Sequence, residues 1–307
     1  MKRSTAKSPL RAPSEGPLIG AHMSVAGGLE LGVERALKVK ARALQIFTKN
    51  ASRWKGKALA APESVRFREA LEASGLAPVA AHASYLINLA SPDAALRKRS
   101  IEALADELRR ADALGVRYVV LHPGAHMGRG LRAGCDRVAE SIDRARRLAP
   151  APEVIVLLET VAGQGTTIGR RFEELARIRE RVERRDLTQF CLDTCHVHAA
   201  GYDIVSERGY EETFEEFDDV LGLETLRFFH VNDSKNERGS RVDRHEHIGR
   251  GKIGTAPFAR ILGDPRFHAV PKVLETPKGK DGVVMDRKNL ALLRRLAEPP
   301  RPGNGAA

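Results

Sequence analysis

Short apolar segments recur at fairly regular intervals along the chain, each rich in β-branched or other apolar residues. Segments of this length and composition are typical of strands buried on both faces of a sheet. Eight such strands are predicted, beginning at Leu18, Ala43, Pro78, Tyr118, Val154, Thr188, Leu226 and Pro271.

Amphipathic segments lie between these strands. The clearest runs from Asp93 to Gly115, a glycine that favours a helix end, and another begins at Asp286. Eight strands alternating with helices predict an α/β fold, a single-domain (β/α)8 TIM barrel. A doubly wound open sheet is the alternative fold, and the strand count together with the residues at the strand ends favours the barrel.

The two ends of the chain lack this periodicity. Residues 1–17 are basic and rich in serine and proline, and residues 298–307 are rich in proline and glycine. We predict disordered tails at both ends. The barrel is expected to occupy residues 18–297.

Composition limits the functional classes. The chain of 307 residues has 51 basic and 40 acidic side chains, a net charge of +11, which suggests a polyanionic partner such as nucleic acid or an acidic membrane surface. Its three cysteines are too few and uneven for a disulfide framework and indicate a reducing compartment, so we expect a cytoplasmic protein. We find no apolar run long enough to span a membrane and no signal peptide.

The predicted strands end in side chains that carry chemistry. In a TIM barrel the carboxyl ends of the strands converge on one mouth, where active sites are built. The loop after the sixth strand adds His196, and the loop after the seventh adds Asp243 and His245. The residues expected at the strand ends are His22, Lys49, His82, His122, Glu159, Asp193, His230 and Glu275.

Five histidines and four carboxylates of this set suit Zn²⁺, Mn²⁺ or Fe²⁺. One ion takes three or four protein ligands, so nine predict more than one ion, with a carboxylate able to bridge; such clusters suit phosphodiester hydrolysis. We expect His198, His247 and His268 to lie outside the cluster, His126 to support it, and Cys191 and Cys195 to be small buried residues. The candidate ligands are His82, His122, Glu159, Asp193, His196, His230, Asp243, His245 and Glu275.

The chain also resembles a known family, endonuclease IV, the apurinic/apyrimidinic endonucleases of base excision repair. The resemblance runs from the first strand to the eighth, and LDTCH-x-x-AAGYD and VDRH-x-x-IG-x-G are its most specific motifs. The matching segments are GAHMSVAGGL, QIFTKN, HASYLINLASP, LHPGAH, ETVAGQGTTIG, CLDTCHVHAAGYDI, FHVNDSK, RVDRHEHIGRGKIG and LETP.

The resemblance implies a barrel of the xylose-isomerase type that holds three zinc ions, with manganese possible in some sites. His82, His122 and Glu159 would form the first site. The second would comprise Glu159, Asp193, His230 and Glu275, with Glu159 as the bridge, and the third His196, Asp243 and His245. Glu159, Glu275 and His122 are the candidate catalytic residues.

The activity implied is hydrolysis of the phosphodiester 5′ to an abasic sugar in duplex DNA, leaving a 3′-hydroxyl and a 5′-deoxyribose phosphate. A hydroxide between the first two ions would attack phosphorus, and the third ion would stabilise the leaving oxygen. The family also trims blocked 3′ ends, so DNA with abasic sites or blocked 3′ ends is the expected partner of a monomeric enzyme.

The resemblance further implies that the abasic nucleotide is flipped into the mouth while side chains wedge into the stack. Tyr85, with Leu86 beside it, matches one wedge. Many relatives carry an arginine two residues before the tryptophan of the second loop, where this chain has Ser52, followed by Arg53. Lys49 and Arg53 are the other candidate DNA contacts.

Two other functions fit parts of the pattern. A metal-dependent sugar isomerase or epimerase would need only Glu159, Asp193, His230 and Glu275 on the same barrel. It would not need the other five candidate ligands or the basic charge. A DNA-binding module without catalysis would be expected to lack a ligand, and every ligand position is filled.

Overall fold

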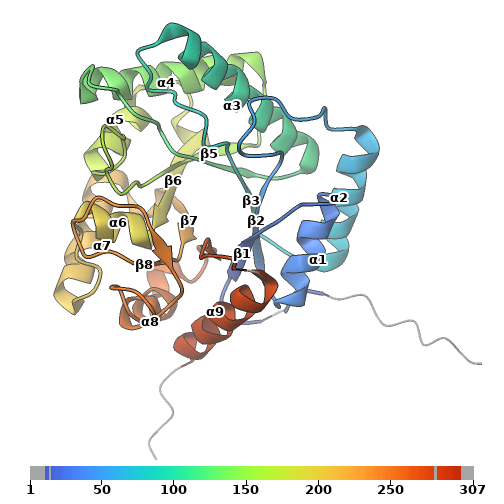
Figure 1. Ribbon diagram of the computed structural model, residues 1–307, viewed down its shortest axis with the longest axis vertical. Helices are drawn as coiled ribbons and strands as arrows, with labels where there is room; N and C mark the ends of the chain where they lie inside the picture. Colours follow the sequence, from blue (N-terminus) through green and yellow to red (C-terminus); the bar gives the residue numbers. More distant parts are fainter. Residues whose placement is uncertain (1–10, 14, 280–281, 299–307) are drawn as a thin grey trace, which may run out of the picture.

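The computed structural model describes residues 11–13, 15–279 and 282–298, and within them the chain forms a closed barrel of parallel strands (Figure 1). The strands neighbour one another in the order β1-β10-β7-β6-β5-β4-β3-β2, so the first strand pairs with both the second and the last. The predicted barrel is confirmed, and the open sheet is excluded because the sheet closes. The barrel strands are β1 Ile19–Met23, β2 Ala43–Phe47, β3 Val79–His82, β4 Tyr118–Leu121, β5 Ile155–Glu159, β6 Thr188–Asp193, β7 Leu226–His230 and β10 Lys272–Leu274.

Helices surround the barrel on the outside (Figure 1). Their apolar faces pack against the strands, so the strands are buried on both sides and read as continuous apolar runs. The α-helices are α1 Glu30–Lys38, α2 Ala61–Ser74, α3 Ala94–Leu114, α4 Leu131–Leu148, α5 Phe172–Arg181, α6 Thr194–Ala200, α7 Glu207–Leu221, α8 Ala256–Gly263 and α9 Gly282–Ala297. Single 3-10 turns occur at η1 Arg185–Leu187, η2 Leu223–Thr225 and η3 Pro265–Phe267, and a hairpin of β8 Asp233–Ser234 and β9 His245–Glu246 lies outside the barrel.

Helix α3 shows how local sequence sets an element's limits. The Asp93 carboxylate accepts hydrogen bonds from the backbone amides of Ala95 and Leu96, which caps the helix start. Gly115 ends the helix at φ 68°, a left-handed conformation that glycine adopts without strain. Both predicted limits of this helix are confirmed, whereas α9 begins at Gly282, before the predicted Asp286.

The barrel interior is filled by apolar side chains, and the residues two positions on from the apolar layer nearest the carboxyl ends of the strands form the layer at the mouth. Successive strand residues alternate between faces, so every second residue points into the barrel. The apolar layer includes Ala43, Ala80, Val120, Leu157, Cys191, Phe228 and Val273. Two positions on stand Gln45, His82, His122, Glu159, Asp193, His230 and Glu275.

Four of the predicted strand ends differ from the structure. The first strand ends one residue later, at Met23, and the fourth and eighth end one residue earlier, at Leu121 and Leu274. The second strand ends at Phe47, two residues before the predicted Lys49. Lys49 is therefore outside the barrel, in the loop that follows.

The predicted tails lie mostly outside the described residues. In the part of residues 1–17 that is described, the backbone amide of Ala12 donates to the carbonyl of Ser74. None of the helices in the described part of the chain has both the length and the apolar character needed to cross a bilayer. All three cysteines are buried free thiols.

Candidate metal centre

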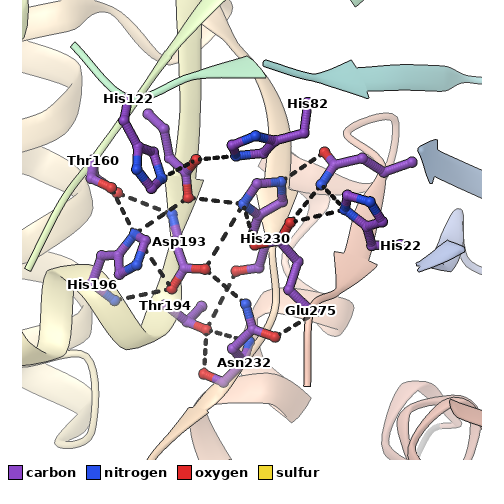
Figure 2. A network of polar contacts seen from close by, with 12 residues as sticks. His22, His82, His122, Thr160, Asp193, Thr194, His196, His230, Asn232 and Glu275 are labelled. Atoms are coloured by element: carbon purple, nitrogen blue, oxygen red, sulfur yellow. Dashed lines mark hydrogen bonds and ion pairs between the residues drawn. The ribbon is translucent and has the colours of Figure 1, made fainter. Parts of the chain in front are cut away.

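The barrel mouth gathers the nine candidate ligands from strands and loops that are far apart in sequence. Figure 2 shows His82, His122, Asp193, His196, His230 and Glu275 converging on one small volume. Within each of three sets, the potential ligand atoms lie within 4.8 Å of one another. The sets, called groups one, two and three below, are His82, His122 and Glu159; Glu159, Asp193, His230 and Glu275; and His196, Asp243 and His245.

Glu159 joins groups one and two because its two carboxylate oxygens face different histidines. Oε2 lies 2.9 Å from His122 Nε2 and 3.2 Å from His82 Nε2. Oε1 lies 2.9 Å from His230 Nδ1. This is the arrangement expected of a carboxylate that bridges two cations.

Group two is completed by one oxygen from each of two further carboxylates. Oε2 of Glu275 lies 3.3 Å from His230 Nδ1, and Oδ2 of Asp193 lies 3.8 Å from the same nitrogen. The Asp193 carboxylate is itself held by the backbone amide of His196, which it caps at the start of α6, and by the side-chain amide of Asn232 at 2.7 Å. Four single donor atoms therefore face one point.

Group three joins α6 to the β8–β9 hairpin. His196 Nε2 lies 3.2 Å from Asp243 Oδ2, and His245 Nε2 lies 3.3 Å from Asp243 Oδ1. The buried Asp233 carboxylate holds the base of this hairpin by accepting from the amides of Gly251 and Ile253. A Cβ on Gly251 would lie 2.2 Å from the carbonyl oxygen of Ser234, so this close approach requires glycine.

Four of the five histidines have one ring nitrogen fixed by an oxygen that can only accept a hydrogen bond. His82 Nδ1 donates to the Ala83 carbonyl, His196 Nδ1 to the Thr160 carbonyl and His245 Nδ1 to the Glu275 carbonyl. His230 Nε2 pairs with the amide oxygen of Gln45 at 2.8 Å. These nitrogens keep their protons, so the other nitrogen of each ring is the one that would present a lone pair to a cation, as in metal-ligating histidines. The donor set thus fits divalent cations.

The electrostatics of the mouth point the same way. Burial alone would raise the pKa of Glu159, but the facing His230 and His122 imidazolium charges outweigh it and hold that pKa well below its ordinary value. Burial would likewise lower the pKa of His196, but Asp193 and Asp243 raise it well above the usual range. Buried carboxylates require positive charge nearby. Without a metal, the histidines supply it by holding protons.

Polar side chains that sequence reasoning did not assign complete the network. Gln45 contacts His230 and Glu275. His22 contacts Glu275, and Thr160 and Asn232 position Asp193 through hydrogen bonds (Figure 2). Gln45 was missed because the second strand was predicted to end at Lys49. Counting two residues on from Ala43, which faces the barrel interior, would have identified it.

Lys49 does not face the mouth. Its side chain is 2% exposed, and its ammonium contacts the carboxylates of Asp106 and Glu107 on α3. Its positive charge is therefore already paired, and we drop it as a DNA contact. Arg53 is exposed in the same loop.

Tyr85 lies at the rim of the mouth and is 60% exposed. Its ring is 5.4 Å from the His82 ring and 6.2 Å from the His122 ring, measured between centroids. Leu86 beside it is half-buried. A cavity of about 250 Å³ opens next to Tyr85, with His122, His196 and Asp243 in its wall.

The remaining histidines and cysteines belong to none of the three groups. His198 is buried, His247 contacts Asn289 at 3.0 Å, and His268 is exposed. The Cys195 sulfur lies within 4.8 Å of potential ligand atoms of Asp193 and His245. Burial raises the pKa of this thiol to about 12, so it is protonated at neutral pH and is a poor ligand beside imidazole and carboxylate.

Comparison with known proteins agrees with this geometry. A family model described as a xylose isomerase-like TIM barrel matches residues 33–296. The chain is 48% identical over 282 residues to a protein of Chloroflexus aurantiacus named probable endonuclease 4, covering 92% of this chain and 99% of that one. It is 49% identical over 278 residues to the protein of the same name from Trichlorobacter lovleyi, covering 91% and 99%.

Solved structures show the same relationship. The crystal structure of endonuclease IV from Thermus thermophilus superposes with a TM-score of 0.82 at 40% identity, covering 91% of this chain and 98% of that one. A D-tagatose 3-epimerase-like protein superposes with a TM-score of 0.68 at 17% identity, covering 91% and 98%, and shares the fold.

Proposed function

The chain belongs to the endonuclease IV family and is a DNA-repair hydrolase of the AP endonuclease type, and we propose that the three groups at its barrel mouth are the catalytic metal centre. The proposed reaction is hydrolysis of the phosphodiester 5′ to an abasic site in duplex DNA, which leaves a 3′-hydroxyl and a 5′-deoxyribose phosphate. We propose that the same centre trims blocked 3′ ends, because both reactions release a 3′-hydroxyl from a phosphodiester.

The observation that carries this proposal is the division of the Glu159 oxygens between His82 and His122 on one side and His230 on the other. A one-site sugar isomerase would use group two alone. Groups one and three give the chain donor atoms for two further cations, as an in-line displacement at phosphorus requires when the attacking and leaving oxygens are both stabilised.

Divalent ions held there would supply a hydroxide at neutral pH and neutralise the phosphate charge. We propose zinc in all three groups, with manganese able to fill some of them. The chain's own side chains fix the geometry. Glu159 holds groups one and two at a set separation, Glu275 orients the nucleophile from the second group, and Asp243 spans the two histidines of the third. The His122 side chain is 32% exposed and that of its neighbour His82 is 2% exposed, so His122 is the more accessible of the two from the mouth.

DNA recognition is proposed to use the rim and the cavity beside it. Tyr85 projects from the rim with Leu86 next to it, and Arg53 lies exposed in the neighbouring loop. A missing base lowers the cost of flipping a nucleotide toward the recessed groups, which favours abasic sites. The net charge of +11 favours binding to the phosphate backbone and predicts that affinity falls as salt rises. We propose that the enzyme acts as a monomer in the cytoplasm.

A nicking assay tests the proposal. The substrate is a labelled duplex with one tetrahydrofuran abasic analogue, which cannot undergo β-elimination. We expect a nick 5′ to the analogue that is lost after chelation and restored by zinc. Absence of a nick by the metal-loaded protein would overturn the proposed activity, and sugar substrates would then test the isomerase alternative.

The number of ions is tested separately. Elemental analysis of the purified protein is expected to find about three ions per chain, one for each group. His245→Ala removes a donor of group three and should lower the metal content by about one ion per chain. Unchanged content in this variant would mean that group three is wrongly assigned.

A further inference from the structure

Gln45 is a fully buried amide in the layer that carries the candidate ligands. It points into the barrel from β2, one step above the apolar residue Ala43. Burying an amide is costly unless its hydrogen-bonding groups find partners. Its hydrogen-bond partners therefore explain why a glutamine occupies this position.

Both ends of this amide are engaged by group two. Its oxygen lies 2.8 Å from His230 Nε2, and its nitrogen lies 2.6 Å from Glu275 Oε1 and 3.0 Å from His22 Nδ1. An ionised carboxylate can only accept, so the amide nitrogen must face Glu275 and the oxygen must face His230. The orientation of the amide is thus fixed by chemistry.

This orientation determines what His230 offers. Because the amide oxygen accepts from Nε2, that nitrogen keeps its proton, and Nδ1 is the nitrogen that would give up its proton to bind a cation. Nδ1 lies 2.9 Å from Glu159 Oε1 and 3.3 Å from Glu275 Oε2. Gln45 therefore selects the histidine tautomer that can bind a cation in group two.

The same amide divides the oxygens of Glu275. Oε1 is occupied by the Gln45 nitrogen, and Oε2 remains to face His230. Glu275 thus turns one oxygen toward His230 and the other toward Gln45. One donor from each of the four residues, with one position left for solvent or substrate, makes five ligands, a number that catalytic zinc can adopt, whereas manganese and magnesium prefer six oxygen-rich ligands.

We propose that Gln45 is a positioning residue of group two that favours zinc over manganese by fixing the His230 tautomer and limiting Glu275 to one oxygen. This inference rests on the proposed metal centre. Without Gln45, Glu275 could bind through both oxygens and the coordination number could rise.

The test compares two variants of Gln45 with a matched control. Gln45→Leu preserves volume and removes both hydrogen bonds, while Gln45→Glu keeps the acceptor for His230 and repels Glu275. Gln189→Leu alters another buried glutamine, on β6, whose partners are Arg227 and the carbonyl of Asp186, away from the mouth. Zinc and manganese affinities are measured by competition with a chromophoric chelator, and the visible spectrum of the cobalt-substituted protein reports coordination number.

We expect Gln45→Leu to weaken zinc binding at one ion per chain by about 10- to 100-fold, the usual cost of losing a residue that orients a ligand. Manganese affinity should fall less, and the cobalt absorption should weaken as the coordination number rises. Gln45→Glu should shift the zinc-to-manganese ratio in the same direction, and Gln189→Leu should change neither affinity.

Unchanged zinc affinity and cobalt spectrum in Gln45→Leu would overturn the inference, as would equal losses of zinc and manganese affinity. Circular dichroism and thermal unfolding of the variants establish that they are folded. If Gln45→Leu does not fold, the zinc and manganese affinities of Gln45→Glu decide the test, because that variant keeps the hydrogen bond to His230. A wild-type chain that binds no metal would instead overturn the proposed centre itself.

Discussion

Two clusters of acidic side chains in this barrel, each with buried members, obtain their compensating charge in different ways. At the mouth, Glu159, Asp193 and Glu275 face imidazole rings. On the flank, between α3 and the loop after β2, Asp106 and Glu107 face the ammonium of Lys49. The flank cluster is defined here as Thr48, Lys49, Asp106, Glu107 and Arg110.

The flank cluster is closed by its own hydrogen bonds. Glu107 accepts from the Thr48 hydroxyl at 2.7 Å and lies 3.3 Å from Lys49 Nζ. Arg110 donates to the Thr48 hydroxyl and carbonyl and, at 3.0 Å, to the carbonyl of Lys57. Lys57 and Thr48 stand at opposite ends of the loop that carries Arg53, so Arg110 fixes both ends of that loop.

The mouth and the flank cluster differ in whether their positive charge can be lost near neutral pH, and this difference indicates a functional role for the mouth and a structural role for the flank. Lysine and arginine keep their charge across the physiological range, so the flank cluster has no reason to take up a cation. Histidine loses its proton near neutral pH, and its neutral ring is a metal ligand. The histidines at the mouth can therefore exchange protons for metal ions, whereas the flank cluster only stabilises the folded chain.

The largest expected effect comes from Glu159→Gln, which leaves the shape of the side chain but removes its charge. Cleavage should fall by at least about a thousandfold, since metal ions supply several kcal/mol of transition-state stabilisation. Binding to abasic DNA should stay within a few-fold of wild type, because the rim is unchanged. Single-turnover kinetics measure the cleavage rate, and fluorescence anisotropy measures the affinity for abasic DNA. A near wild-type rate would contradict the bridging role.

Glu107→Ala should act on stability instead. The free energy of unfolding should fall by about 3 kcal/mol, because the buried Lys49 ammonium keeps only Asp106 as a partner and the Thr48 hydroxyl loses its acceptor. Denaturant unfolding measures this loss, while the metal content and the cleavage rate of the folded protein should be preserved. Glu102→Ala, on the exposed surface of the same helix, is the control and should change stability by less than about 0.5 kcal/mol. A loss of metal in Glu107→Ala would contradict the assignment of the flank cluster to stability alone.

Removing the metal should destabilise the chain in a pH-dependent manner. A free metal concentration about a thousand times the Kd raises the free energy of unfolding by about 4 kcal/mol. In the metal-free chain, Asp193 and Asp243 outweigh burial and raise the pKa of His196 well above the usual value, and Cys191, Glu275 and Glu159 do the same for the pKa of His230. Their contribution to stability is complete below the unfolded pKa of about 6.5 and is lost as pH rises through the folded values.

Protons compete with metal for the same nitrogens, so metal binding strengthens as pH rises. The gap in melting temperature between loaded and stripped protein should therefore widen from about pH 6 to about pH 8. Thermal scans of both forms at the two pH values check this. A gap that is constant or that narrows would argue against histidine ligation.

The smallest effect is expected for Tyr85, at the rim of the mouth. Tyr85→Ala should weaken binding to abasic duplex DNA by about 1–3 kcal/mol, the range for losing one aromatic stacking contact. Metal content and stability should be unaffected, because the ring is largely exposed. Leu148→Ala, an exposed apolar residue at the end of α4, is the control for loss of surface area. Equal affinity in the two variants would remove Tyr85 from the DNA-binding surface.

Much of the fold could be read from the chain because its signals are local. The eight apolar segments predict the strands, and Asp93 and Gly115 mark the limits of α3, since capping depends on neighbours a few residues away. The identities of the candidate ligands were also readable, because each stands at or just after a strand end, and strand ends meet at the barrel mouth.

The tertiary structure alone decided which atoms face one another. Lys49 pairs with residues more than fifty positions away on α3, and Gln45 reaches His230 across the barrel. Sequence periodicity sets the face of a strand on which a side chain lies, but the register between neighbouring strands sets what that side chain meets. The division of the Glu159 oxygens between two sets of histidines follows from strand order and curvature. Strand β5 lies between β3 and β4 on one side and β6 and β7 on the other, and the curvature of the barrel turns the ends of these strands toward one carboxylate.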